Sequence, residues 1–232
     1  PGNIRNRMGL TTSRSLGVNA TYDWKRVKLR SNIQYVGTDR LEDSRTTVDN
    51  YIRKDKSITR STNNSRTENN NLVANAFLEW KMDSVTTLIF RPQYRFSANG
   101  RENKGFQEGW GNDVLLNEKV SSGSNHNSQY NVTMMLQLSR KLSQKGRNVA
   151  LKVDYGTNSS SNDRKNLSTT HYFKNDREDS KNQKIEDDID GYNYRVQLVY
   201  VEPLLWMHHL QLRYSYQYKV NNSDRFVYDW NE

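Results

Sequence analysis

Residues 210–220 read LQLRYSYQYKV, and residues 192–200 read YNYRVQLVY. In both segments every second residue is aliphatic or aromatic, and most of the residues between them are amides or cations. A helix repeats every 3.6 residues and cannot produce such alternation over eleven positions, whereas a β-strand turns successive side chains to opposite faces. Each segment is therefore predicted to be a strand with one apolar and one polar face.

The same alternation predicts six more strands, at about 6–22, 26–37, 70–82, 86–98, 128–142 and 147–157. Arg14 falls on the apolar parity of the first strand, so we expect a bulge there or a start near Ser15. Short connections near 23–25, 83–85, 143–146 and 202–208 alternate with long polar loops at 38–70, 98–127 and 157–191. The first of these loops keeps β-prone residues at Val48, Ile52 and Ile58 and could extend its hairpin. Short turns at one end and long loops at the other are typical of outer-membrane β-barrels.

The composition limits the alternatives. The chain has 232 residues, of which 33% are hydrophobic, with a mean hydropathy of −1.03. This is low for a packed soluble core, where roughly 45–50% is usual, but fourteen Tyr, five Trp and six Phe are too many for a disordered chain. No segment approaches the roughly 20 apolar residues of a transmembrane helix. The absence of cysteine excludes disulfides, cysteine zinc sites and a cysteine nucleophile.

Strands with one apolar face fit either a soluble sandwich or a membrane barrel. A sandwich buries the apolar face against a second sheet, whereas a barrel turns it to lipid and its polar face to the lumen. The predicted strand lengths and two groups of aromatic residues near the strand ends favour the barrel, because such groups form the interfacial belts of a barrel wall. The aromatic residues expected at the lipid interfaces are Tyr22, Trp24, Trp80, Tyr94, Tyr130, Tyr155, Trp206 and Tyr216.

The polar parity of the strands is rich in cations. The side chains expected to line the lumen are Lys28, Arg30, Glu79, Lys81, Arg91, Arg95, Lys152, Asp154, Arg195, Arg213 and Lys219. An eight-stranded barrel is filled by its own side chains, and so many unpaired cations there would be costly to bury. We therefore expect an antiparallel transmembrane β-barrel whose eight strands, in four hairpins, are part of a larger barrel. A complete small eight-stranded barrel is the alternative.

Three segments carry a family resemblance: FLEWKMDSVTTLIFRPQYRFSANG (77–100), LSRKLSQKGRNVALKVDYGTNSS (138–160) and YRVQLVYVEPLLWMHHLQLRYSYQYKVNNSD (194–224). Together they resemble the outer-membrane β-barrel domain of TonB-dependent receptor-like proteins of the Bacteroidetes. The resemblance implies a barrel of about 22 strands with an N-terminal plug, which imports nutrients or metal chelates with energy from TonB. Neither a plug nor a TonB-binding segment is visible, so residues 1–232 are expected to be a segment of one barrel domain. A non-transporting structural or assembly barrel in a surface complex remains the alternative function.

Other chemistry has little support in the sequence. His208 and His209 are adjacent and lack further ligands at zinc spacing, and the acidic stretch 186–190 lacks the full calcium-loop pattern, although a weak ion site there stays open. No nucleophile signature occurs. Cations and aromatic residues lie on opposite faces, unlike in a nucleic-acid-binding sheet. We expect a non-enzymatic protein without a cofactor or metal site. Its expected partners are outer-membrane lipid and lipopolysaccharide, further barrel strands and a plug, and TonB and a surface lipoprotein, with no nucleic acid.

Overall fold

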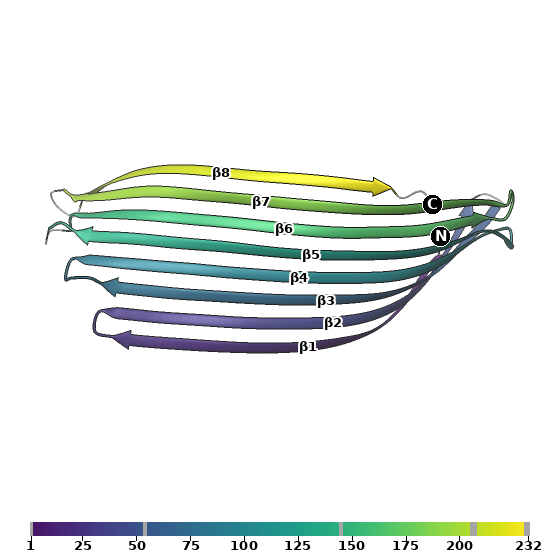
Figure 1. Cartoon of the computed structure of the whole chain (residues 1–232), viewed down its shortest axis with the longest axis horizontal. Coiled ribbons are helices and arrows are strands. Elements are labelled where there is room, and N and C mark those ends of the chain that lie inside the picture. The colour runs from purple at the N-terminus through teal and green to yellow at the C-terminus, as the bar shows by residue number, and fades with distance from the viewer. Residues whose placement is uncertain (1, 53–54, 144–145, 205–207, 230–232) are drawn as a thin grey trace.

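The computed structural model describes residues 2–52, 55–143, 146–204 and 208–229, and it consists of one antiparallel sheet (Figure 1). The eight strands are β1 (Gly2–Trp24), β2 (Val27–Ile52), β3 (Asp55–Lys81), β4 (Thr86–Gly111), β5 (Val114–Lys141), β6 (Asn148–Tyr172), β7 (Arg177–Pro203) and β8 (His209–Asp229). Each strand pairs with the next along the chain, so the order in the sheet is the order in the sequence. The predicted all-β, antiparallel fold class with eight strands in four hairpins is confirmed.

The strands are much longer than predicted. They contain 21 to 28 residues, whereas a strand needs only about 9–11 to cross a bilayer. The predicted loops 98–127 and 157–191 are wrong, because most of their residues are paired in β4–β7. The suggestion that 38–70 extends its hairpin is confirmed by unbroken pairing from Val27–Trp80 to Ile52–Asp55.

Tight turns join the strands at both ends. Asn112 and Asp113 connect β4 to β5 with φ angles of 50° and 62°, the left-handed conformation that two-residue hairpin turns require and that Asn and Asp tolerate. At the opposite end Asp83 accepts hydrogen bonds from the backbone N–H groups of Val85 and Thr86, at 2.7 and 2.6 Å. These two hydrogen bonds lower the pKa of Asp83, the bond from Val85 most strongly, and they fix the predicted short turn between β3 and β4.

The bulge expected near Arg14 is absent. Pairing between β1 and β2 continues without a shift from Gly2–Asp49 to Trp24–Val27. Arg14 instead stands opposite Gly37, on the same face as Leu16 but two residues beyond it, where the apolar rows have ended. No bulge is therefore needed to explain a cation at this position. A register shift occurs elsewhere, between Gly109 and Trp110 in β4.

The strand ends are staggered in one direction across the sheet. A continuous row of paired residues includes Trp24, Trp80, Leu138 and Leu198. The last pairs at the short-turn end are Trp24–Val27, Lys81–Thr87, Lys141–Asn148 and Pro203–His209. These four pairs lie zero, one, three and five residues beyond that row, so each successive hairpin extends further toward the short turns.

The opposite end is displaced in the same sense. Its last pairs, Ile52–Asp55, Gly111–Val114 and Tyr172–Arg177, lie 17, 15 and 13 residues beyond the row of Tyr35, Phe96 and Ser159. A displacement of one residue per strand, with a rise of about 3.4 Å and a strand spacing of about 4.8 Å, corresponds to a tilt of about 35°. Strands in closed barrels are tilted by this amount.

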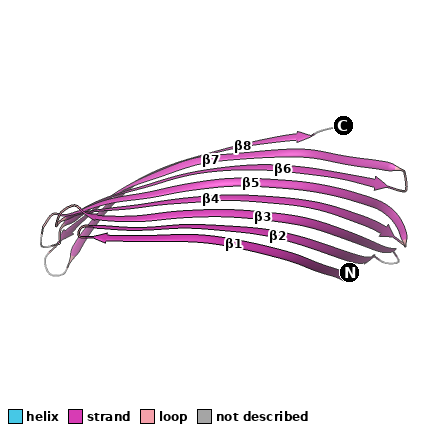
Figure 2. Cartoon of the chain, turned by 60° about the horizontal axis from the view of Figure 1, so that its bottom comes forward, coloured by secondary structure: helices cyan, strands magenta, loops and turns pink. Residues whose placement is uncertain are grey.

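The sheet is a single bowed layer (Figure 2). Within the described residues β1 and β8 do not contact each other, so the sheet is open at both edges. Ile185 is the only hydrophobic side chain that is buried in the described part of the chain. The described residues include no helix long and apolar enough to cross a membrane. An open wall whose two edge strands lack partners agrees with the expectation of a piece of a larger barrel.

Candidate functional site: the two faces of the sheet

One face of the sheet is apolar over a limited height. We name it the Leu136 face and the opposite one the Arg91 face. Each row across the sheet contains one residue from every strand. One such row on the Leu136 face consists of Tyr22, Leu29, Leu78, Phe90, Leu136, Val153, Val196 and Tyr216. The apolar rows run from that of Trp24 to that of Leu16, and we call this zone the band; in its last row β1–β5 are apolar, whereas β6–β8 carry Ser159, Asp190 and Asn222. Its nine residues cover about 27 Å along the strand, close to the height of a barrel's lipid-facing belt at this tilt.

No second layer covers the band. Tyr214 and Leu198 are 69% and 45% exposed, and Val196 also lies on the open surface of the single sheet. Leu212, two residues nearer the short turn than Tyr214, is 56% exposed. A soluble sandwich would bury these side chains against another sheet. An uncovered apolar face that crosses all eight strands is far larger than the patches that soluble monomers expose. The Leu136 face of the band therefore has the properties of a surface solvated by hydrocarbon.

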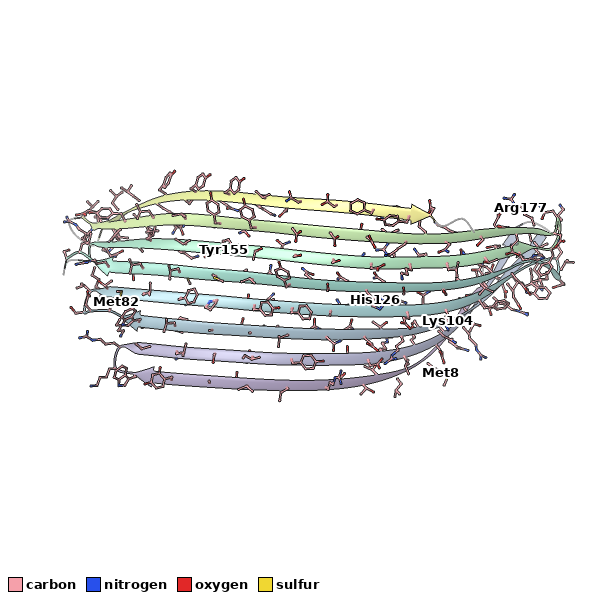
Figure 3. All side chains as sticks on the ribbon, viewed as in Figure 1. Met8, Met82, Lys104, His126, Tyr155 and Arg177 are labelled. Carbon is pink, nitrogen blue, oxygen red and sulfur yellow. The ribbon has the colours of Figure 1, made fainter. Side chains whose placement is uncertain are left out.

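The predicted interface aromatics occupy this face, except Trp206, which lies outside the described residues. Trp24, Tyr22 and Trp80 are near the short turns, and Tyr94 and Tyr130 are in the two upper rows of the band. Tyr155 is in the middle row. Figure 3 places Tyr155 nearer to Met82, at the short-turn end, than to Arg177 at the other end. Tyr216 lies in the same row as Tyr22, and the centre of its ring is 6.1 Å from that of Tyr194. That these rings meet lipid interfaces stays a prediction.

The Arg91 face holds all of the side chains predicted for the lumen. The register places Lys28 opposite Glu79, and Asp154 opposite Arg195, on this face. Lys152 contacts Asp154 at 3.1 Å. Among the described residues the other predicted lumen cations have no carboxylate oxygen within 4.0 Å; they are Lys28, Arg30, Lys81, Arg91, Arg95, Arg195, Arg213 and Lys219. The band thus combines an apolar face with a face of unpaired cations, but a lumen beside it remains a prediction.

The sequence analysis missed two features of the Arg91 face. Phe77 lies among its cations, and the Arg91 guanidinium sits 4.9 Å from the centre of the Phe77 ring. The upper rows of this face are also rich in carboxamides, which include Asn19, Asn32, Gln34, Asn69, Asn71, Asn75, Gln93, Asn99, Asn127, Gln129, Asn131, Asn158, Asn162, Asn193 and Asn221. Some pair across strands: the Gln93 amide donates to the Asn75 oxygen at 2.7 Å. Only the strand register, which the sequence alone does not supply, brings them together.

Beyond the band the strands continue with mostly polar residues on both faces, and apolar side chains such as Leu41, Phe106 and Val120 are scattered among them. We call this part the extension; it comprises the paired residues on the far side of the row of Leu16. At the β2–β3 hairpin it adds 17 residues per strand, or about 58 Å along the strand. The apolar alternation stops there, which explains why the sequence pattern identified only the band.

Several charges in the extension are paired, whereas most of the cations predicted for the lumen are not. Arg66 donates two hydrogen bonds to the Asp39 carboxylate, at 2.7 and 3.3 Å, and also contacts Glu68 at 2.7 Å. The hydrogen bond from Arg66 is the main cause of the lowered pKa of Asp39. Lys184 pairs with Glu186, and this contact raises the pKa of Lys184. These pairs are solvent-exposed, so each contributes little to stability.

Another ion pair lies below the band, beside the short turns. The Arg147 guanidinium donates to the Glu202 carboxylate, with Nε at 2.7 Å from Oε2, and the Tyr200 hydroxyl donates to the same carboxylate. The hydrogen bond from Arg147 is the largest cause of the lowered pKa of Glu202. The pair joins β7 to the turn before β6 at the edge of the predicted interface.

Nothing in the described residues groups three or more His, Cys, Asp or Glu side chains in a way that could hold a metal ion. The acidic stretch 186–190 is divided by the pleat, because Asp187 lies on the Arg91 face, where it contacts Arg225 at 3.3 Å, whereas Glu186 lies on the Leu136 face beside Lys184. His208 lies in the turn and His209 begins β8.

Comparison with known proteins gives distant likenesses. The chain matches no family model and no curated protein sequence. Among solved structures, the RagAB peptide transporter is 7% identical with a TM-score of 0.31, and the match covers 88% of this chain and 36% of that one. The ferric preacinetobactin receptor BauA from Acinetobacter baumannii is 8% identical with a TM-score of 0.25, and the match covers 96% of this chain and 43% of that one. The ferric-catecholate import receptor Fiu from E. coli K12 is 6% identical with a TM-score of 0.22, and the match covers 97% of this chain and 47% of that one. The chain thus spans less than half the length of these outer-membrane proteins.

Proposed function

We propose that this chain is part of the wall of a bacterial outer-membrane β-barrel of the TonB-dependent receptor type, which imports a nutrient or a metal chelate past a plug. The observation that carries the proposal is the band, where an uncovered apolar face is backed by a face of unpaired cations. Hydrocarbon on one side and water or an acidic plug on the other would satisfy both faces at once.

The wall geometry supports a barrel wider than eight strands. The tilt of about 35° is that of a closed barrel, yet β1 and β8 are separate edges among the described residues. In a membrane, unpaired edge N–H and C=O groups cost several kcal/mol each, so both edges need further strands. Additional strands also enlarge the lumen, which removes the crowding of cations that an eight-stranded interior would impose.

The positive charge of the Arg91 face suggests what the lumen would bind. Cations such as Arg91, Arg95 and Arg195 lack carboxylate partners in the described part of the sheet and would attract anionic solutes or the acidic side chains of a plug. The lipid partners on the other face would be acyl chains and lipopolysaccharide. None of these features calls for catalysis, and our expectation of a non-enzymatic protein stands as a prediction.

The extension favours a second candidate. Because more than half of β2 and β3 lies beyond the band, a wall that serves mainly as a scaffold for a surface complex, without transport, would account for its height. The two candidates differ in their coupling to TonB.

Capture of TonB separates them. Outer-membrane vesicles that contain the full-length protein should retain the purified periplasmic domain of TonB, and vesicles from cells without the protein should not. Retention of equal amounts by both would contradict the import proposal and leave the scaffold.

A further inference from the structure

We propose that Arg101, Asn125 and Arg164 on the Arg91 face form an entry site for an acidic saccharide, a polyhydroxylated solute with carboxylate or sulfate groups. The inference rests on the proposed function, because it takes the Arg91 face as the lumen. It adds a substrate class and a location above the membrane.

The register puts the three residues side by side. Arg101 in β4 stands opposite Asn125 in β5, which stands opposite Arg164 in β6. The two arginines are thus two strand spacings, or about 10 Å, apart with one carboxamide between them. They lie in the extension, five residues beyond the Phe96 and Ser159 row at the top of the band, where a solute from outside would arrive before it reached the cations of the band.

The arginines are available to a ligand. Among the described residues neither Arg101 nor Arg164 has a carboxylate within 4.0 Å, although their neighbour Arg40 is paired with Glu42 at 2.8 Å. The acidic residues adjacent to them in the chain, Glu102 and Asp163, point to the opposite face because alternate side chains do so in a strand. Guanidinium groups match carboxylate and sulfate oxygens through paired N–H donors.

The central carboxamide also lacks a partner. The Asn125 Oδ1 atom is buried and accepts no hydrogen bond in the structure. A buried polar atom without a partner is costly, so a ligand hydroxyl that donates to it would be favoured. An acidic sugar can provide both groups within about 10 Å: a hydroxyl that donates to Asn125 and an anionic group that accepts from an arginine.

The surrounding positions extend the same chemistry. Residues two positions away on the three strands are Asn99, Asn103, Asn127, Asn162, Asn166 and Gly123. A Cβ atom at Gly123 would come within 2.8 Å of the Asn103 Oδ1 atom, so glycine leaves room for that side chain to lie over β5. This block contains no apolar side chain, and Ile185, which stands opposite Arg164 in β7, is buried. A saccharide can meet such a surface with its hydroxyl and anionic groups, whereas a peptide would also need places for apolar side chains.

Binding to the full-length protein in nanodiscs tests the site. The probes are oligosaccharides of galacturonate and of sulfated glucosamine, with maltotriose as the neutral control and triglutamate as the acidic peptide. We expect at least one acidic saccharide to bind more than about 10-fold tighter than maltotriose and triglutamate, and this preference to weaken with added salt. The variant Arg101→Gln/Arg164→Gln should lose on the order of 10- to 100-fold in affinity, and Asn125→Asp, which places a negative charge between the arginines, should lose at least as much.

Lys104→Gln is the matched control, since it removes a cation from β4 at nearly the same height but on the Leu136 face. It should bind the probes like the unaltered protein. Equal binding of maltotriose, preferential binding of triglutamate, no binding of any acidic saccharide, or an equal loss in Lys104→Gln would each overturn the proposal. These results are independent of TonB capture, so a failure of the entry site alone is distinguishable from a failure of the proposed function.

Discussion

The band and the extension are two parts of the same eight strands with different relations to solvent. In the band, Leu136 and Gln137 are neighbours in the chain but belong to an apolar and a polar face. In the extension, both faces are mostly polar, and some charges, such as Arg66 and Asp39, are paired with each other. The backbone ladder is continuous through both parts. The difference therefore indicates that side-chain alternation marks the band and does not mark where the strand ends.

The largest effect should come from an arginine placed in the band. Leu136 and Leu167 are on the same face and have similar exposures of 42% and 47%, but only Leu136 lies in the band. Leu136→Arg should cost about 2–4 kcal/mol, as a cation near the middle of a lipid-facing belt does, and should reduce the amount of folded protein in the outer membrane. Leu167→Arg should change the free energy of unfolding by less than about 0.5 kcal/mol. Equal losses in urea titrations of the two variants would remove the distinction between band and extension.

Charge on the Arg91 face of the band should control ion selectivity. The triple variant Arg91→Gln/Arg95→Gln/Arg195→Gln removes three unpaired cations and should lower the anion-to-cation permeability ratio several-fold. Reversal potentials of the full-length protein in planar bilayers measure this ratio. The same number of substitutions on the Leu136 face of the extension, at Lys104, Lys165 and Arg45, should leave it unchanged. Cation selectivity of the unaltered protein would contradict a cationic lumen.

The smallest effect concerns pH and the extension. Because the hydrogen bond from Arg66 lowers the pKa of Asp39 below its ordinary value of about 3.9, this pair stabilises the folded hairpin at pH above that ordinary value. Its contribution is lost as the pH falls through the lowered pKa. Hydrogen exchange of the β2–β3 amides near Asp39, corrected for intrinsic rates, should accelerate over that acidic range, and Asp39→Asn should abolish the acceleration. The effect should shrink in high salt. An unchanged acid profile in Asp39→Asn would show that the pair is irrelevant there.

The comparison also explains how far the sequence could predict the fold. Alternation in segments such as 192–200 and 210–220 located the band, and the short turns were found within about two residues. The extension was missed because segments such as STNNSRTENNN (61–71) face water on both sides and carry no period. Their strand conformation comes from cross-strand hydrogen bonds to β2 and β4. That the cations of the band share the Arg91 face was predictable from parity. The grouping of Arg101, Asn125 and Arg164 was not, since only the register of three strands brings them together.

Cysteine labelling tests the account most directly, and residues 1–232 contain no cysteine that would react besides the introduced ones. Four single variants of the full-length protein in outer-membrane vesicles form two adjacent pairs: Leu136→Cys and Gln137→Cys in the band, and Leu167→Cys and Ser168→Cys in the extension. A membrane-impermeant maleimide should label Gln137→Cys, Leu167→Cys and Ser168→Cys and leave Leu136→Cys unmodified. Labelling of Leu136→Cys as fast as Leu167→Cys would mean that the band does not face lipid, and the account would be wrong.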